Sequence, residues 1–286
     1  MTHTLEDLLE ALEDVDDATR EEAAKALAEL GDPKTLDPLV SACGDDFWSV
    51  RAYAGCAVAK IGGPKALEAL VGLFNDPIME VRNQAVEATA KIGPAVVGRM
   101  IAALKDERWR VREHAAKTCG EIRDKAAVDA LIAVCRDRDG AVKSAAAEAL
   151  GKIGDAKAVP ALIKLFRDSS KIVRETAGTA LICIGQPSVN PLVEALKDKD
   201  FVVRCHAARA LGGMTTDYQI GRTWVRDAHV VDALIVTLKD PDRAVRDELL
   251  HCGERDARVR AVEHAGAVRA RRGLGELGLA RLLDDA

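Results

Sequence analysis

The sequence predicts an all-α protein, a right-handed α-solenoid (superhelix) of about eight helix-turn-helix units of about 31 residues each. Three observations support this prediction. A Val-Arg pair recurs at a nearly fixed period, an Asp precedes each pair at a fixed distance, and small apolar residues follow each pair with helical spacing. Repetition at such a period is typical of units that bury their apolar surfaces only against their neighbours.

The Val-Arg pairs set the period of the chain. A Val-Lys pair fills the one gap, and Arg20 stands at the same phase near the start. We call the basic residue of each pair the repeat arginine and the Asp six residues before it the repeat aspartate. The pairs are Val50-Arg51, Val81-Arg82, Val111-Arg112, Val142-Lys143, Val173-Arg174, Val203-Arg204 and Val245-Arg246. The repeat aspartates are Asp14, Asp45, Asp76, Asp106, Asp137, Asp168, Asp198 and Asp240.

The residues around each repeat arginine predict the second helix of each unit. Apolar or small residues stand at −1, +3, +6 or +7, and +10 from the repeat arginine. Ala fills the +3 position in seven successive copies, from Ala23 to Ala207. This spacing places them on one face of a helix and does not fit the alternation of a strand.

A turn and the first helix of the next unit follow. Gly often comes directly after the +10 residue, as at Gly31 and Gly62, where it predicts a helix C-terminus because Gly adopts left-handed backbone conformations. Pro residues such as Pro33 and Pro64 then fit the first turn of the next helix. The repeat aspartate comes next, and we expect it to cap the following helix. We also expect repeat aspartates and arginines to form hydrogen-bonded ladders between neighbouring units.

Composition narrows the class of partner. The net charge is −5, which does not favour binding to nucleic acid or to an anionic membrane surface. No apolar run is long enough to span a bilayer, and the acidic start lacks the features of a secretion signal. The seven Cys residues are unevenly spaced, without a Cys-x-x-Cys motif, and are expected to be reduced thiols. We therefore expect a cytoplasmic protein.

Units such as residues 142–166 resemble the short HEAT-like repeats of the phycobilisome-lyase type, and the resemblance covers about residues 10–250. It implies an α-solenoid whose second helices line a concave face. Some proteins with similar repeats are enzymes. Deoxyhypusine hydroxylase holds a di-iron site with repeated His-Glu dipeptides, but none of the six His residues here is followed by Glu. Bilin lyases attach a chromophore to phycobiliproteins, and here the resemblance concerns the repeat alone.

Positions that vary between units predict where a partner binds. The position three residues before the repeat arginine holds Trp48, Met79, Trp109, Gly140, Lys171 and Phe201. An exposed row of Trp, Met, Trp and Phe is costly in water unless a partner covers it. Trp, Tyr and Arg also dominate binding hot spots. The alternative is that these side chains pack on their own helices. The candidate partner-binding residues are Trp48, Tyr53, Met79, Trp109, His114, Phe201, His206, Arg209, Tyr218 and Trp224. Of these, His114 and His206 are interpreted as surface residues.

Two irregular segments set the predicted domain boundaries. Residues 1–252 are expected to form the solenoid, with an extra loop at 214–227 that contains Tyr218 and Trp224. Residues 253–286 lose the repeat and are expected to form an irregular C-terminal cap or tail, or to reflect a shifted reading frame.

The sequence best fits a non-catalytic scaffold or adaptor that binds another protein or peptide on its concave face. Two alternatives stay open: a subunit of a bilin-lyase type enzyme, and a nucleic-acid-binding solenoid, which the mixed charges of the concave positions disfavour. The sequence shows no phosphate-binding loop, no nucleophile motif and no metal-ligand spacing, so we predict no catalytic, cofactor-binding or metal residues. It leaves the oligomeric state open.

Overall fold

The computed structural model describes residues 4–215, 237 and 240–246. The chain divides into two compact units, Met1–Ile153 and Gly154–Ala286. Every element in the described residues is helical, which confirms the all-α prediction. No helix in this part of the chain is both long enough and apolar enough to cross a membrane.

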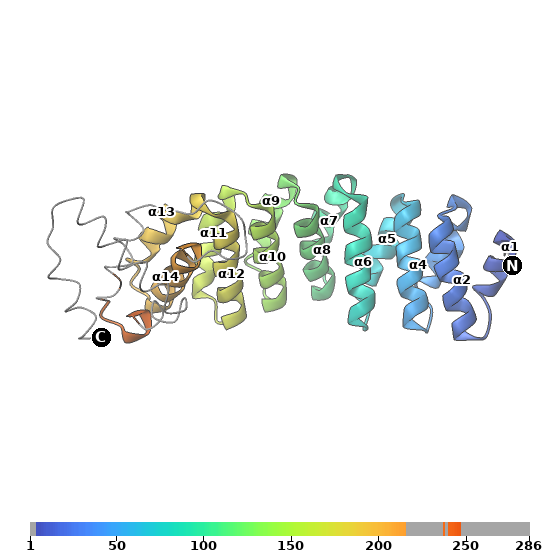
Figure 1. The fold of residues 1–286 in the computed structure, drawn as a ribbon, viewed down its shortest axis with the longest axis horizontal. Coiled ribbons are helices and arrows are strands. Elements are labelled where there is room, and N and C mark those ends of the chain that lie inside the picture. Colours follow the sequence, from blue (N-terminus) through green and yellow to red (C-terminus); the bar gives the residue numbers. More distant parts are fainter. Residues whose placement is uncertain (1–3, 216–236, 238–239, 247–286) are drawn as a thin grey trace. The chain divides into compact units, whose positions relative to one another are not determined.

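The first unit is built from alternating short and long helices in two layers (Figure 1). After the short α1 (Leu5–Ala11), the long helices lie side by side as successive neighbours in one layer, and each has 14 residues. These are α2 (Asp17–Leu30), α4 (Trp48–Ile61), α6 (Met79–Ile92), α8 (Trp109–Ile122) and α10 (Gly140–Ile153). The second layer holds α3 (Leu36–Ala42), α5 (Pro64–Leu73), α7 (Val97–Ala103) and α9 (Val128–Val134). Short 3-10 turns at Pro33–Thr35, Pro94–Val96 and Lys125–Ala127 precede α3, α7 and α9.

The second unit repeats this plan. Its long helices are α12 (Lys171–Ile184) and α14 (Phe201–Thr215), and its short ones are α11 (Val159–Lys164) and α13 (Gln186–Ala195). Short 3-10 turns at Ala156–Ala158 and Leu165–Arg167 flank α11. The helix-turn-helix repeat predicted from the sequence is thus confirmed in both units.

The core consists of small and branched side chains contributed by the repeat. The Val that precedes each repeat arginine is fully buried, as at Val50 and Val173, and the Ala at +3 is buried throughout. The residue at +10 differs from the prediction. Leu30 is 57% exposed, whereas Ile184 is buried, so this position lies at the margin of the core.

The turns after the long helices depend on positive φ angles. Gly31 has φ 65° and Gly62 has φ 78°, as the predicted Gly-terminated helices require. At the end of α8 the corresponding residue is Arg123, which adopts φ 59° without being Gly. Pro33 and Pro64 open their helical segments as predicted.

The predicted capping role of the repeat aspartate is wrong. Asp45 lies two residues before the N-cap of α4, which is Phe47 and makes no side-chain cap bond. The Asp45 carboxylate instead accepts a hydrogen bond from the Phe47 amide at 2.8 Å, in the turn that leads into the helix. Asp76 and Ile78 repeat this arrangement before α6. The carboxylate is thereby held where the arginine of the preceding unit reaches it.

The predicted extra loop at 214–227 lies almost wholly outside the described residues, and the predicted tail at 253–286 lies entirely outside them.

Candidate interaction surface

Arginine-aspartate pairs join neighbouring units along the edge where the long helices begin. Each of four repeat arginines donates Nε and Nη2 to both carboxylate oxygens of the next repeat aspartate, at 2.7 to 3.0 Å. The same side chains donate Nη1 to the carbonyl of their own repeat aspartate at 2.8 Å. The pairs are Arg20–Asp45, Arg51–Asp76, Arg112–Asp137 and Arg204–Asp240. The predicted ladder is therefore confirmed at these junctions.

The ladder lowers the pKa of the Asp45, Asp137 and Asp240 carboxyl groups. Burial raises the pKa of Asp45, but hydrogen bonds from Arg20 and from the Phe47 amide outweigh burial and leave this pKa below its usual value. Asp137 responds in the same way to burial and to Arg112. Because the bonds are bidentate and partly buried, they fix the register of neighbouring units and are unsuited to proton transfer.

Two junctions between repeats have a different arrangement from the ladder. In both, the following repeat contains a histidine. Arg82 donates only to the carbonyls of Asp76 and Pro77, and its Nε has no hydrogen-bond partner among the described residues. The Asp106 carboxylate, which would be the partner of Arg82 in the ladder, instead accepts hydrogen bonds from Arg108. At the corresponding place in the second unit, Arg174 Nε donates to His206 Nε2 at 3.1 Å.

An exposed apolar row crosses the first unit beside the ladder. Trp48, Met79 and Trp109 are the first residues of α4, α6 and α8, and they are 40%, 63% and 39% exposed. Helices α4, α6 and α8 are successive neighbours in the layer of long helices (Figure 1), so the three side chains belong to successive repeats. The Arg110 guanidinium lies over the Trp109 ring, 4.9 Å from its centroid. We call Trp48, Met79 and Trp109 the row residues.

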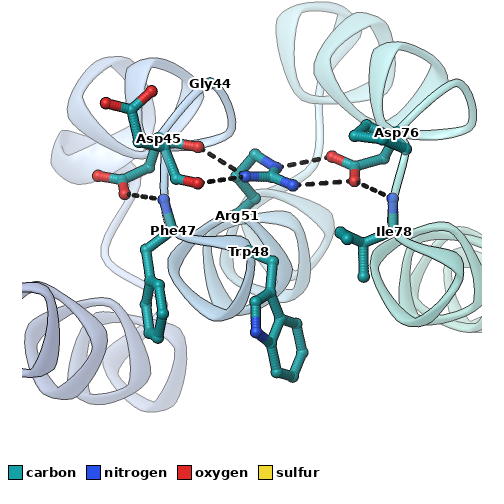
Figure 2. Close-up of a pocket in the computed structure, with 9 residues that line it drawn as sticks. Gly44, Asp45, Phe47, Trp48, Arg51, Asp76 and Ile78 are labelled. Atoms are coloured by element: carbon teal, nitrogen blue, oxygen red, sulfur yellow. Dashed lines mark hydrogen bonds and ion pairs between the residues drawn. The ribbon is translucent and has the colours of Figure 1, made fainter.

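A notch of about 530 Å³ opens between the starts of α4 and α6. Its apolar lining includes Phe47, Trp48, Pro77 and Ile78, and Ile78 is itself 40% exposed. Figure 2 shows the Phe47, Trp48 and Ile78 side chains on one side of the Asp45–Arg51–Asp76 ladder. Because that ladder already engages its own polar groups, the notch offers mainly apolar contacts to a ligand.

Acidic side chains border the row. Each row residue has an exposed carboxylate close by in the sequence: Asp46, Glu80 and Glu107. None of these three carboxylates forms an ion pair within the described part of the chain. Asp45, Asp76 and Asp106, by contrast, are paired with arginines. We call these three exposed carboxylates the acidic border of the row; at the α8 end, the Arg110 guanidinium also lies over Trp109.

The remaining predicted partner-binding residues fall into three groups. Tyr53 is half-buried in the first unit, and in the second Phe201 is exposed while His206 and Arg209 are half-buried. Tyr218 and Trp224 lie outside the described residues.

The interpretation of His114 as a surface residue is wrong. His114 is 2% exposed, its Nδ1 lies 2.7 Å from the Arg110 carbonyl, and its ring lies 6.2 Å from that of Phe74. It packs inside the first compact unit and presents no surface to a partner.

Phe47 and Ile78 complete the notch and were not among the predicted residues. The sequence contains a signal for them: the position four residues before the repeat arginine is apolar at Phe47 and Ile78, whereas Arg108 and Asp139 stand there in the next two repeats. Within the described ranges, no three His, Cys, Asp or Glu side chains are grouped closely enough to hold a metal ion.

Comparisons with known proteins agree with this architecture. The family described as HEAT repeats matches residues 5–95 and 97–182. Among curated proteins, none matches the chain.

Three solved structures illustrate the similarity. The first is an engineered protein, 22% identical over 94% of this chain and 83% of its own, with a TM-score of 0.38. The second is human deoxyhypusine hydroxylase in complex with glycerol, with 24% identity, coverage of 71% and 82%, and a TM-score of 0.35. The third is the complex of CpcE and CpcF of phycocyanin lyase from Nostoc, with 23% identity, coverage of 51% and 97%, and a TM-score of 0.43. Likenesses at this level bear on no functional question.

Proposed function

Because this chain belongs to the HEAT-repeat family, we propose that it is a non-catalytic scaffold or adaptor that binds a partner protein through its layer of long helices. The observation that carries the proposal is the exposed row of Trp48, Met79 and Trp109 on three successive helices. Such a row is unfavourable in water, and aromatic side chains in a shallow apolar patch are typical of binding hot spots.

The basic side chains of the long helices favour a protein over a nucleic acid. Lys60 donates hydrogen bonds to the carbonyls of Ala28 and Glu29 at the end of α2, so its ammonium group is engaged by the preceding long helix. Four further basic residues of the long helices form ion pairs with glutamates of the same layer: Lys91, Lys117, Lys152 and Arg209. A strand of phosphates would have to displace these contacts, which weakens the attraction on which non-specific binding depends.

The proposal is tested by quantitative affinity capture from the source cells. The variant carries Trp48→Ala and Trp109→Ala together, and its controls are Leu30→Ala and Ile172→Ala, which remove exposed apolar side chains elsewhere. We expect a specific partner to be recovered with the wild type and both controls and to be lost with the double variant. Equal recovery with all four proteins would contradict the proposal.

The two alternative functions have tests of their own. A subunit that attaches a bilin would give a red-shifted, protein-bound absorption when mixed with the chromophore. A nucleic-acid-binding solenoid would be retained on DNA at physiological salt. Either result, if it persisted in the double Trp variant, would replace the scaffold proposal.

A further inference from the structure

We infer that the row residues bind an extended segment of the partner that has an apolar side chain at every third position and Lys or Arg in between. This inference rests on the proposed function, because it concerns the same surface. It specifies the chemistry and the spacing of the segment, which binding alone does not.

The spacing of the row selects the conformation of the segment. Neighbouring packed helices have axes about 8–10 Å apart, so successive row residues recur at about that interval along the edge. A polyproline II segment rises about 3.1 Å per residue and therefore presents the same face every three residues, about 9.3 Å apart. A β-strand presents the same face about every 6.6 Å, which loses register after one unit. Polyproline II segments also dock typically on aromatic-lined surfaces.

A helical partner is disfavoured because it would place apolar side chains between its anchors, against the acidic border. A helix reaches this spacing with anchors seven residues apart, about 10.5 Å. Its apolar stripe would then place further apolar side chains, three and four residues from each anchor, against the acidic border of the row. An extended segment places one anchor at each repeat, and the positions between the anchors can hold polar side chains.

The acidic border selects the charge of those intervening side chains. Asp46, Glu80 and Glu107 are exposed and have no ion-pair partner among the described residues. One such carboxylate lies near each row residue in the sequence: Asp46 and Glu107 come two residues before Trp48 and Trp109, and Glu80 comes directly after Met79 and accepts a hydrogen bond from Gln84. A segment with Lys or Arg between its anchors is complementary to both features at once.

The notch beside Trp48 supplies one defined anchor site. Phe47, Trp48, Pro77 and Ile78 line it, and the ladder of Asp45, Arg51 and Asp76 closes one side. Since these ladder groups bond to one another, an apolar side chain in the notch leaves none of them unpaired. Asp46 also lines the notch, so one carboxylate of the acidic border lies at this anchor site. We expect the first anchor to enter here.

The experiment uses the full chain and a labelled peptide of four Leu-Pro-Lys triplets, in which Pro favours polyproline II and Leu recurs every third residue. Two control peptides separate the two claims. Four Leu-Pro-Glu triplets reverse the charge, and a peptide of the same composition with its four Leu residues adjacent removes the spacing. Binding is measured by fluorescence anisotropy at low and high salt.

We expect the Leu-Pro-Lys peptide to bind, and both control peptides to bind about tenfold more weakly or worse. The double variant Trp48→Ala, Trp109→Ala should weaken binding about tenfold, and Asp46→Asn with Glu107→Gln should reduce its dependence on salt. Leu30→Ala should bind like the wild type. Equal affinity for all three peptides, or unchanged binding by the double Trp variant, would overturn the inference.

If the Leu-Pro-Lys peptide does not bind, but a cellular partner is lost with the double Trp variant, the row binds a partner of different chemistry and the inference is wrong. If the cellular partner is recovered equally with that variant, the proposed function is wrong as well. Circular dichroism and thermal unfolding of each variant confirm that it is folded before binding is compared.

Discussion

At the scale of single residues, the two histidine junctions are the most informative departures from the repeat. In each, a Phe lies eight residues before the repeat arginine and a His lies two residues after the next one. The His ring packs against the Phe ring, with centroids 6.2 Å and 5.5 Å apart. One set lies in each compact unit: Phe74, Arg82 and His114 in the first, and Phe166, Arg174 and His206 in the second. An aromatic-histidine contact thus accompanies each replaced ladder rung.

The buried His114 makes stability depend on pH. Burial lowers its pKa, and the nearby positive charges of Lys117 and Arg82 act in the same direction, although the Arg110 carbonyl and Glu113 oppose them. The folded protein therefore favours the neutral ring. Its contribution to stability is complete above the ordinary His pKa of about 6.5, and it is lost as pH falls from there through the lowered folded-state value.

The variant His114→Gln tests this dependence, because Gln84 occupies the same position in the preceding unit. Denaturant unfolding between about pH 7 and about pH 5 should show a smaller loss of unfolding free energy in the variant than in the wild type. Parallel pH profiles for the two proteins would show that His114 has no part in the dependence.

Ser188 provides a second prediction at this scale. Its side chain is fully buried, and its hydroxyl has no hydrogen-bond partner among the described residues. Ser188→Ala removes an unsatisfied polar group, so we expect thermal and denaturant unfolding to show a gain of about 1 kcal/mol or more. Thr35 occupies the corresponding position near the start of the chain, but its hydroxyl donates to the Asp32 carbonyl. Thr35→Val is the matched control and should be destabilising; a loss in both variants would refute the explanation.

At the scale of elements, the sequence predicts the helices well because the repeat aligns equivalent positions. Val at −1 and Ala at +3 indicate the buried face of every long helix, and the buried residues agree. The error over the repeat aspartate has a physical cause. An Asp before a helix suits either an N-cap or the turn two residues earlier, and the choice depends on the arginine of the preceding unit, which only the fold brings near.

The junction between α8 and α10 depends on a glycine. A Cβ on Gly120 would lie 2.8 Å from Ala149 Cα, a backbone atom of the neighbouring helix. Gly120→Ala should therefore destabilise the protein by about 1–3 kcal/mol, despite the better helix propensity of Ala. Gly178→Ala is the matched control in α12, where the added Cβ would meet only the Phe166 ring at 3.9 Å. We expect that control to be neutral or stabilising in denaturant unfolding, and an equal loss in both variants would exclude the packing explanation.

At the scale of the whole molecule, the sequence predicts the exposed row but not which neighbouring side chains surround it. Trp48, Met79 and Trp109 were identified from one variable position, and their exposure agrees with a surface role. The burial of His114 and the contribution of Ile78 to the notch could not be read in this way, because both depend on which neighbour each side chain meets. Periodicity identifies equivalent positions, whereas contacts between units decide which of them face solvent.

The same architecture predicts that damage to one rung stays local, since each unit packs only on its neighbours. Arg51→Ala leaves the buried Asp76 carboxylate without its bidentate partner and should cost about 3 kcal/mol. Hydrogen exchange followed by mass spectrometry should show faster exchange in α4 and α6 and unchanged exchange in α12 and α14. Arg82→Ala is the matched control, because Arg82 has no carboxylate rung to lose, and its effect should be smaller. Faster exchange throughout both units after Arg51→Ala would mean that the chain unfolds as one cooperative body, and the view of locally stabilised repeats would have to be abandoned.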